Sequence, residues 1–339
     1  MLARVPDPDP NVPAEIVALA RQRAQAREAR DWQVADELRA RIEGAGWKVV
    51  DAGTDFTLTP ARFPDVVEDA RVLYGGPASV PSRLESAPDR SASILLRFPG
   101  DAPTVEACLA GLRQQALPDL HVVVVADASG HDREATLALL GGAAGSRSTE
   151  TGGPEEDPIG AGALDLEVLW TAAPLGPGAS LAAAALRARG EVLIVLEPYA
   201  VPAASLAAQA VAALHDPGVA LAGFPGRRSA DLHRFEPSGP GPVTAVGAGC
   251  LAFRRRDAAR RDPRDERLHL SESVAIWWSL LLRDEGPDAT PRAALAIEMP
   301  FTLGDDRAAL AGSTRDRLAR RDAYRITERF GDRPQLATR

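Results

Sequence analysis

The sequence is poor in cysteine and in long apolar runs, and each shortage excludes a class of protein. Its 339 residues include two cysteines, Cys108 and Cys250, too few for a disulfide framework or a four-thiolate zinc site. Both stand in apolar surroundings, so we expect small buried side chains. No run of about 18 apolar residues occurs, which excludes a membrane-spanning helix. The first residues lack an apolar signal core, so we expect a cytoplasmic protein.

The sequence is also poor in lysine, because Lys48 is the only lysine among its 39 basic residues. This bias is typical of a GC-rich, bacterial genome, so single surface arginines are no sign of phosphate binding. The 47 acidic residues give a net charge of -8, which argues against a broad nucleic-acid surface but leaves a local patch open. A basic run is interspersed with acidic residues and is predicted to form a solvated face, with a phosphate-facing patch as the alternative; its members are Arg254, Arg255, Arg256, Arg260, Arg261 and Arg264.

The apolar pattern divides the chain into parts of unequal size. The predicted parts are a disordered N-terminus (1–13), a helical hairpin with a β-flap (14–60), a linker (61–91), an α/β domain (92–310) and a C-terminal helix with a tail (311–339). In the fourth part, short apolar strands alternate with helices of about a dozen residues, which indicates a mainly parallel sheet covered on both faces. Residues 141–162 are rich in Gly, Ser, Thr and Glu and are predicted to form a flexible insertion.

Two smaller patterns in the α/β part are predicted to serve the fold. Gly176-Pro177-Gly178 is too short for a phosphate-binding loop and is predicted to be a simple connecting loop. Trp277 and Trp278 are adjacent on a predicted helix, so only one of them can face a given site. Packing is therefore the expected role of this pair, rather than a platform for a sugar ring.

Six stretches carry a resemblance to a known family over the α/β part. They are residues 93–96, 108–120, 124–129, 186–197, 247–255 and 265–286. In this order and spacing, residues 93–286 resemble a family 2 glycosyltransferase domain of the GT-A fold. The resemblance implies a Rossmann-like α/β fold of the nucleotide-diphospho-sugar transferase type, preceded here by the helical hairpin.

The resemblance also implies a reaction, the transfer of a sugar from a nucleotide-sugar donor to an acceptor hydroxyl. A divalent cation, Mg²⁺ or Mn²⁺, neutralises the leaving diphosphate and is held by carboxylates, because hard cations prefer oxygen ligands. A base takes the proton of the acceptor. The nucleotide binds at the carboxyl ends of the parallel strands.

Glu197 is the candidate metal ligand. The family has two Asp separated by one residue just after the fourth strand, and the sequence here reads Glu197-Pro198-Tyr199. One carboxylate is kept, while the second position is a phenol, which stays protonated at neutral pH and binds Mg²⁺ or Mn²⁺ poorly. The alternative is that Glu197 only ends a strand.

Glu272 is the candidate catalytic base. The family places a Glu-Asp pair before the last core helix, and the sequence here reads Ser271-Glu272-Ser273. Serine cannot act as a base at pH 7, so the role would pass to Glu272. The alternative is that a serine caps the helix and Glu272 stabilises its first turn.

Asp127 is the candidate contact to the nucleoside. It matches the second acid of the Asp-Asp-Gly-Ser stretch that follows the second strand in the family, whereas Ala126 replaces the first acid. The alternative role is a loop-capping Asp. Because the metal, base and donor positions all depart from the family pattern, two functions stay open. The chain is either a divergent glycosyltransferase or a non-catalytic scaffold that needs no cofactor.

The hairpin carries a second resemblance. Residues 26–32, 35–39 and 46–51 make the segment 14–60 similar to the C-terminal module of cysteinyl-tRNA synthetases. Between Glu15 and Glu43, however, six arginines face six acidic residues, so the module has no electrostatic RNA footprint. Its possible partners are a protein or tRNA, and the charge balance gives RNA little support.

Overall fold

A computed structural model describes most of the chain as two compact units, Met1–Pro64 and Asp65–Arg339. The described residues are 12–52, 55–60, 63–68, 71–98, 102–115, 117, 119–126, 138–140, 164–262, 265, 267–304 and 312–338. Three predictions therefore lie outside the described residues: the role of Asp127, the insertion over 141–162 and most of the disordered N-terminus.

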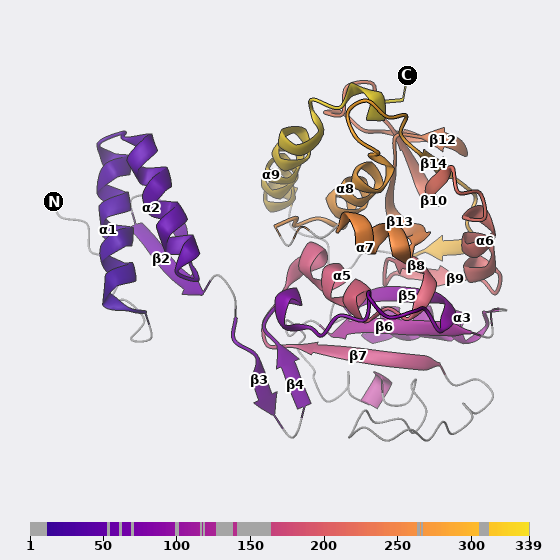
Figure 1. Cartoon of the computed structure of the whole chain (residues 1–339). Coiled ribbons are helices and arrows are strands. Elements are labelled where there is room, and N and C mark those ends of the chain that lie inside the picture. Colours follow the sequence, from indigo (N-terminus) through magenta and orange to yellow (C-terminus); the bar gives the residue numbers. More distant parts are fainter. Residues whose placement is uncertain are drawn as a thin grey trace. The chain divides into compact units, whose positions relative to one another are not determined.

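The first unit is the predicted helical hairpin with its β-flap (Figure 1). It consists of α1 (Ala14–Glu28), α2 (Trp32–Gly44), β1 (Trp47–Ala52) and β2 (Asp55–Pro60), with β1 and β2 paired antiparallel. Asp31 is the N-cap of α2, because its side chain accepts a hydrogen bond of 3.2 Å from the Val34 N–H.

A small apolar core and one ion-pair cluster hold this unit together. Ile16, Ala20 and Ile42 are buried and pack with partly buried residues of β1 and β2. The buried Arg23 donates to both oxygens of Asp51 at 2.7 and 3.1 Å, and Arg27 donates to the same carboxylate. These guanidinium groups lower the pKa of Asp51.

The second unit is built on an eleven-stranded mixed sheet. Its strands run β12-β14-β10-β13-β8-β5-β6-β7-β4-β3, with β11 paired to β10. Their bounds are β3 (Val66–Glu68), β4 (Arg71–Tyr74), β5 (Arg90–Phe98), β6 (Leu120–Ala126), β7 (Asp165–Thr171), β8 (Gly190–Leu196), β10 (Val219–Arg228), β11 (Glu236–Ser238), β12 (Gly241–Val243), β13 (Ala245–Arg254) and β14 (Ala293–Ala296). The central strands β8, β5, β6 and β7 are parallel, whereas β13 pairs antiparallel with β8.

Helices cover both faces of this sheet (Figure 1). They are α3 (Ala102–Arg113), α5 (Gly176–Arg187), α6 (Leu206–Ala213), α7 (Arg255–Arg261), α8 (Ser271–Arg283) and α9 (Gly312–Phe330). Short 3-10 turns cover Pro77–Ser79 and Pro334–Leu336, and β9 (Ala200–Pro202) pairs with β15 (Phe301–Leu303) outside the main sheet. None of the helices in the described ranges combines the length and the apolar character that crossing a bilayer requires.

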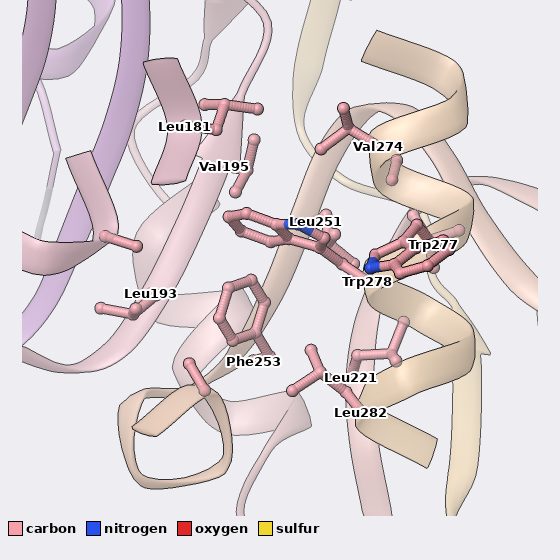
Figure 2. Packing of buried hydrophobic residues seen from close by; sticks show 14 of the residues in the cluster. Leu181, Leu193, Val195, Leu221, Leu251, Phe253, Val274, Trp277, Trp278 and Leu282 are labelled. Carbon is pink, nitrogen blue, oxygen red and sulfur yellow. The ribbon is translucent and has the colours of Figure 1, made fainter. Parts of the chain in front are cut away.

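Alternate residues of the central strands supply two separate cores. Leu95 packs on the side of α5 and α8, while its neighbours Ile94 and Leu96 pack on the side of α3 and α6. On the first side, Trp278 meets Phe253 edge to face, with ring centroids 5.3 Å apart (Figure 2). This alternation explains why the strands read as nearly continuous apolar runs in the sequence.

The tryptophan pair packs as predicted. Trp277 and Trp278 are both buried. The Trp277 ring lies edge to face with Phe330 of α9, with centroids 5.1 Å apart. Both predicted buried thiols are also confirmed, and burial raises the pKa of Cys108 and of Cys250 to about 12.

Two predictions about local structure were wrong. Gly176–Gly178 is the first turn of α5 rather than a loop. A Cβ at Gly178 would lie 2.5 Å from the Asp265 carbonyl oxygen, so this turn packs closely on the 265–268 segment. Residues 61–91, expected as a linker, contain β3 and β4, and β4 pairs with β7 and so extends the main sheet.

The basic run at 254–256 is not a solvated face throughout, which corrects a third prediction. Arg254 and Arg255 are 5% and 4% exposed, while Arg256 is exposed. Arg255 donates to the backbone carbonyls of Arg83 and Ser86, the latter at 2.6 Å. The two buried guanidiniums thus satisfy irregular backbone rather than solvent or phosphate.

Candidate functional site

The chain order of the central strands creates a switch point between β5 and β8. From β5 the chain passes through α3 to β6, on one side of β5, whereas β7 and α5 lead back to β8, on the other side. Connections that leave in opposite directions open a crevice at the carboxyl ends of the two strands, where open α/β sheets bind ligands. Leu196 ends β8, so Glu197 is the first residue beyond this end.

Glu197 is buried at this switch point, with 6% of its surface exposed. Its N–H donates 3.0 Å to the Gly249 carbonyl oxygen, and its own carbonyl accepts the N–H of Ala200 at 2.9 Å. The backbone of Glu197 is therefore fixed between β13 and β9. This placement agrees with a strand-ending residue and equally with a ligand-facing carboxylate.

Glu272 lies in the first turn of α8 and reaches the same stretch of β13. One of its oxygens accepts the Ala248 N–H at 2.7 Å, and the other accepts from Arg227 Nε at 2.5 Å. A Cβ at Gly247 would lie 2.8 Å from both of these oxygens, so glycine is needed here for close approach. The structure thus brings Glu197 and Glu272 to one segment, Gly247–Gly249.

A small hollow opens against that segment. Its polar walls are Glu197, Ser271 and Gly247–Gly249, and its apolar walls are Leu181, Val195, Leu251, Val274, Ala275 and Trp278. The space in which the centre of a water molecule can lie is about 10 Å³, so the hollow holds roughly one water molecule. The described walls therefore enclose a water-sized space, and Asp127 stands outside the described residues.

Trp278, one wall of the hollow, has a buried donor without a partner in the described part of the chain. Trp278 Nε1 is buried without a hydrogen-bond acceptor among the described residues. Figure 2 shows this indole ring lying beside Val195, Leu251 and Phe253. A buried N–H without an acceptor is costly unless an ordered water accepts its hydrogen bond.

The described donor set does not fit a resident metal centre. Glu197 is the one carboxylate among the residues that line the hollow. Across the described ranges, no group of three or more His, Cys, Asp or Glu side chains could hold a metal ion. A hard cation needs several oxygen ligands, and the Glu197 carboxylate alone does not supply them.

Sequence reasoning missed Arg227, the partner of Glu272. Arg227 lies on β10, 45 residues before Glu272, in a stretch that reads as a polar loop. Arg227 belongs to no recognisable motif, and arginine is too common in this chain to indicate a site by itself. The antiparallel pairing of β10 with β13 sets Arg227 opposite Ala245, and from there its side chain reaches Glu272.

Comparisons with known proteins support the fold. No family model matches the chain. A 55-residue part, 16% of this chain, is 44% identical to the cysteine–tRNA ligase of Opitutus terrae and spans 12% of that protein's length. This agrees with the resemblance to cysteinyl-tRNA synthetases.

Solved structures similar to this chain are GT-A glycosyltransferases. GalNAc-T7, solved with UDP, GalNAc and Mn²⁺, aligns with a TM-score of 0.51 and 13% identity over 72% of this chain and 48% of that chain. The mannosyltransferase PcManGT from Pyrobaculum calidifontis, in complex with GDP-Man and Mn²⁺, aligns with a TM-score of 0.48 and 17% identity over 76% and 70%. The GT-A-like fold expected from the sequence is confirmed, and at this identity the likeness concerns the fold alone.

Proposed function

We propose that the chain is a divergent glycosyltransferase-like protein that binds a nucleotide sugar at the carboxyl ends of β5 and β8. The observation that supports this most is the position of Glu197 at the switch point, bonded through Gly249 to the segment that also holds Glu272. A GT-A fold places donor nucleotides at this end of the sheet. The reaction that fits is transfer of the sugar to an acceptor hydroxyl.

Within this proposal, each predicted site residue keeps its role as a prediction. Asp127 follows β6, the strand next to β5, and would contact the nucleoside. Glu197 would face the diphosphate and any Mg²⁺ or Mn²⁺ that arrives with it. Glu272 would act as base only by giving up its ion pair with Arg227.

Thermal unfolding with added donors tests the binding proposal. The full chain is heated with UDP-GlcNAc, UDP-GalNAc or GDP-mannose, each with and without Mn²⁺. A donor present at about 100 times its Kd should stabilise the fold by about 2.7 kcal/mol. Absence of a shift with every donor would overturn the proposal.

A matched pair of variants localises any donor that binds. Glu197→Gln keeps the size of the side chain and removes its charge, and we expect it to weaken Mn²⁺-dependent binding by at least about tenfold. Glu328→Gln, on the exposed surface of α9, is the control and should bind as the natural chain does. Equal binding by both variants would remove Glu197 from the site.

A non-catalytic scaffold is the second candidate, and the contacts of Glu272 favour it. Both of its oxygens are hydrogen-bonded inside the fold, to Arg227 and Ala248, as expected of a structural group. On this reading Glu272→Gln lowers the melting temperature, and donors produce no shift. Because the hairpin resembles a tRNA ligase segment, binding of labelled tRNA to the full chain is measured in parallel. The variant Trp32→Ala, which alters an exposed side chain of the hairpin, tests whether the hairpin takes part in that binding.

A further inference from the structure

We propose that His269, oriented by the buried Asp322, is the proton acceptor of the transfer reaction. The inference rests on the proposed function and assigns its base to a pair that the family-type motif does not include. It starts from a histidine–carboxylate contact between two elements, the segment before α8 and the middle of α9.

Asp322 is a fully buried carboxylate with a fixed orientation. One oxygen accepts the backbone N–H groups of His269 and Leu270, each at 3.0 Å. The other oxygen lies 2.8 Å from Nδ1 of His269. Two backbone donors therefore fix the orientation of the carboxylate, and its hydrogen bond to Nδ1 fixes the orientation of the His269 ring.

This contact sets the tautomer of His269. An ionised carboxylate only accepts hydrogen bonds, so in the neutral ring Nδ1 carries the proton and Nε2 has the lone pair. The His269 side chain is 38% exposed, while that of Asp322 is 0% exposed. A buried acid behind a ring that reaches solvent is the arrangement in which a carboxylate orients a general base and stabilises it once protonated.

Two arginines near this pair, one on each element, are bound to a different acid. On the segment before α8, Arg267 is hydrogen-bonded to Asp265. On α9, Arg325 donates to the same Asp265 at 2.6 Å. Both cations are thus neutralised by a different acid, so His269 is the cationic partner that Asp322 would gain on proton transfer.

The pair is close to the candidate site along the chain. Ser271, two residues after His269, lines the hollow, and Glu272 follows it. A proton taken by Glu272 would break its ion pair with Arg227 at 2.5 Å. A proton taken by His269 creates an ion pair with Asp322 instead, so the second route is favoured.

The chemical step balances without any further reactant. The acceptor hydroxyl oxygen forms a bond to the anomeric carbon of the donor, and its proton passes to Nε2 of His269. The bond between the anomeric carbon and the diphosphate oxygen breaks, and its electron pair leaves with the nucleoside diphosphate. The imidazolium then releases the proton to water.

Three variants of the full chain test the inference in an assay of donor turnover, with water or a sugar as the acceptor. His269→Gln should lower kcat at least about 100-fold with little change in KM, because general base catalysis contributes about that much. Asp322→Asn should lower kcat less and flatten the rise of rate with pH. His233→Gln is the control: His233 also bonds α9, at Thr327 Oγ1, and its removal should leave kcat unchanged.

Further measurements separate a catalytic role from a structural one. Imidazole added to His269→Ala should restore turnover, which no structural role would predict. Since Asp322→Asn removes a buried charge that could be needed for folding, His269→Gln carries the test alone if that variant is unstable. A kcat and pH profile of His269→Gln equal to those of the natural chain would overturn the inference.

The same assays keep this inference distinct from the proposed function. If donors bind the natural chain but are neither transferred nor hydrolysed, the pair is not catalytic and the inference fails, while donor binding stands. If no donor binds, both fail.

Discussion

At the scale of single residues, Arg254 illustrates how this chain uses arginine inside the fold. Its guanidinium donates to the carbonyl oxygens of Val219 and Asp216, at 2.7 and 2.5 Å, and to that of Leu214. Burial lowers the pKa of Arg254, and the nearby Asp257 opposes that effect. The planar fork of arginine satisfies several acceptors that lysine would meet one at a time.

Arg254→Met should therefore destabilise the second unit by about 3 kcal/mol, because it removes three hydrogen bonds that a buried guanidinium donates to backbone carbonyl oxygens. The measurement is chemical unfolding followed by circular dichroism. Arg256→Met changes an exposed member of the same run and should stay within about 0.5 kcal/mol of the natural chain. Equal losses in the two variants would contradict the role given to Arg254.

His121 is a second residue whose burial has a measurable consequence. The Ser93 hydroxyl oxygen accepts the N–H groups of Arg189 and Gly190, at 3.0 and 2.7 Å, so its own hydrogen is left for Nδ1 of His121 at 3.2 Å. Desolvation by burial lowers the pKa of His121 to about 4, and the carboxylate of Asp165 opposes this only in part.

Acid should therefore weaken the fold through His121. The unfolded chain binds a proton below about pH 6.5, while the folded chain does so only below about 4. This contribution to stability is complete above pH 6.5 and is lost as the pH falls towards 4, by roughly 3 kcal/mol in all. The free energy of unfolding of His121→Gln should depend less on pH over this range, and that of the exposed His215→Gln should not differ from the natural chain. If the free energy of unfolding of His121→Gln depended on pH as strongly as that of the natural chain, the assignment would be refuted.

At the scale of secondary structure, apolar patterns predicted the elements that form the two cores. The parallel strands β5, β6 and β8 were recognisable because both of their faces are mostly buried, which produces nearly continuous apolar runs. The cap at Asp31 was predictable because its partner is three residues away. Local periodicity and local partners are what a sequence displays directly.

Elements that depend on distant partners were not predictable. The valine-rich strands β3 and β4 lie between prolines, and only the pairing of β4 with β7, about 100 residues later, makes them part of the sheet. The same holds for the site: the sequence marked Glu197 and Glu272, but not Arg227, because the contact depends on the register of β10 and β13. The pairing of His269 with Asp322 likewise spans 53 residues.

The C-terminal turn Pro334–Leu336 is an element that the second unit needs. Leu336 is fully buried, and its carbonyl oxygen accepts from Arg283 of α8 at 2.9 Å. Leu336→Ala should lower the free energy of unfolding by about 3 kcal/mol through the cavity it leaves. Denaturant titration measures this, with the exposed Asp332→Ala as control. A neutral Leu336→Ala would mean that the turn is dispensable.

At the scale of the whole molecule, the chain has separate cores for its two units. The hydrophobic cluster of the first unit, which contains Ile42, shares no residue with the two clusters of the second. A unit of this size has a small reserve of stability, since small domains bury a smaller share of their surface than large ones.

Ile42→Ala should therefore lower the free energy of unfolding of the first unit by about 3 kcal/mol, which is a large share of the stability of so small a core. Hydrogen exchange should accelerate in the amides of α1 and α2, while exchange in β5 and β6 keeps its natural rate. Val50→Ala, at an exposed position of β1, serves as the control. Faster exchange in β5 and β6 would show that the two units unfold together.

The two buried thiols make this chain well suited to site-specific labelling. Cys108 and Cys250 are its only cysteines, and their high pKa values and complete burial protect them from maleimide reagents at neutral pH. A cysteine introduced at an exposed position of each unit, such as Val50 and Glu328, would react selectively. Fluorescent dyes attached there would report the distance between the hairpin and the sheet domain, and any change in that distance when a nucleotide sugar or tRNA is added, without removing either natural cysteine.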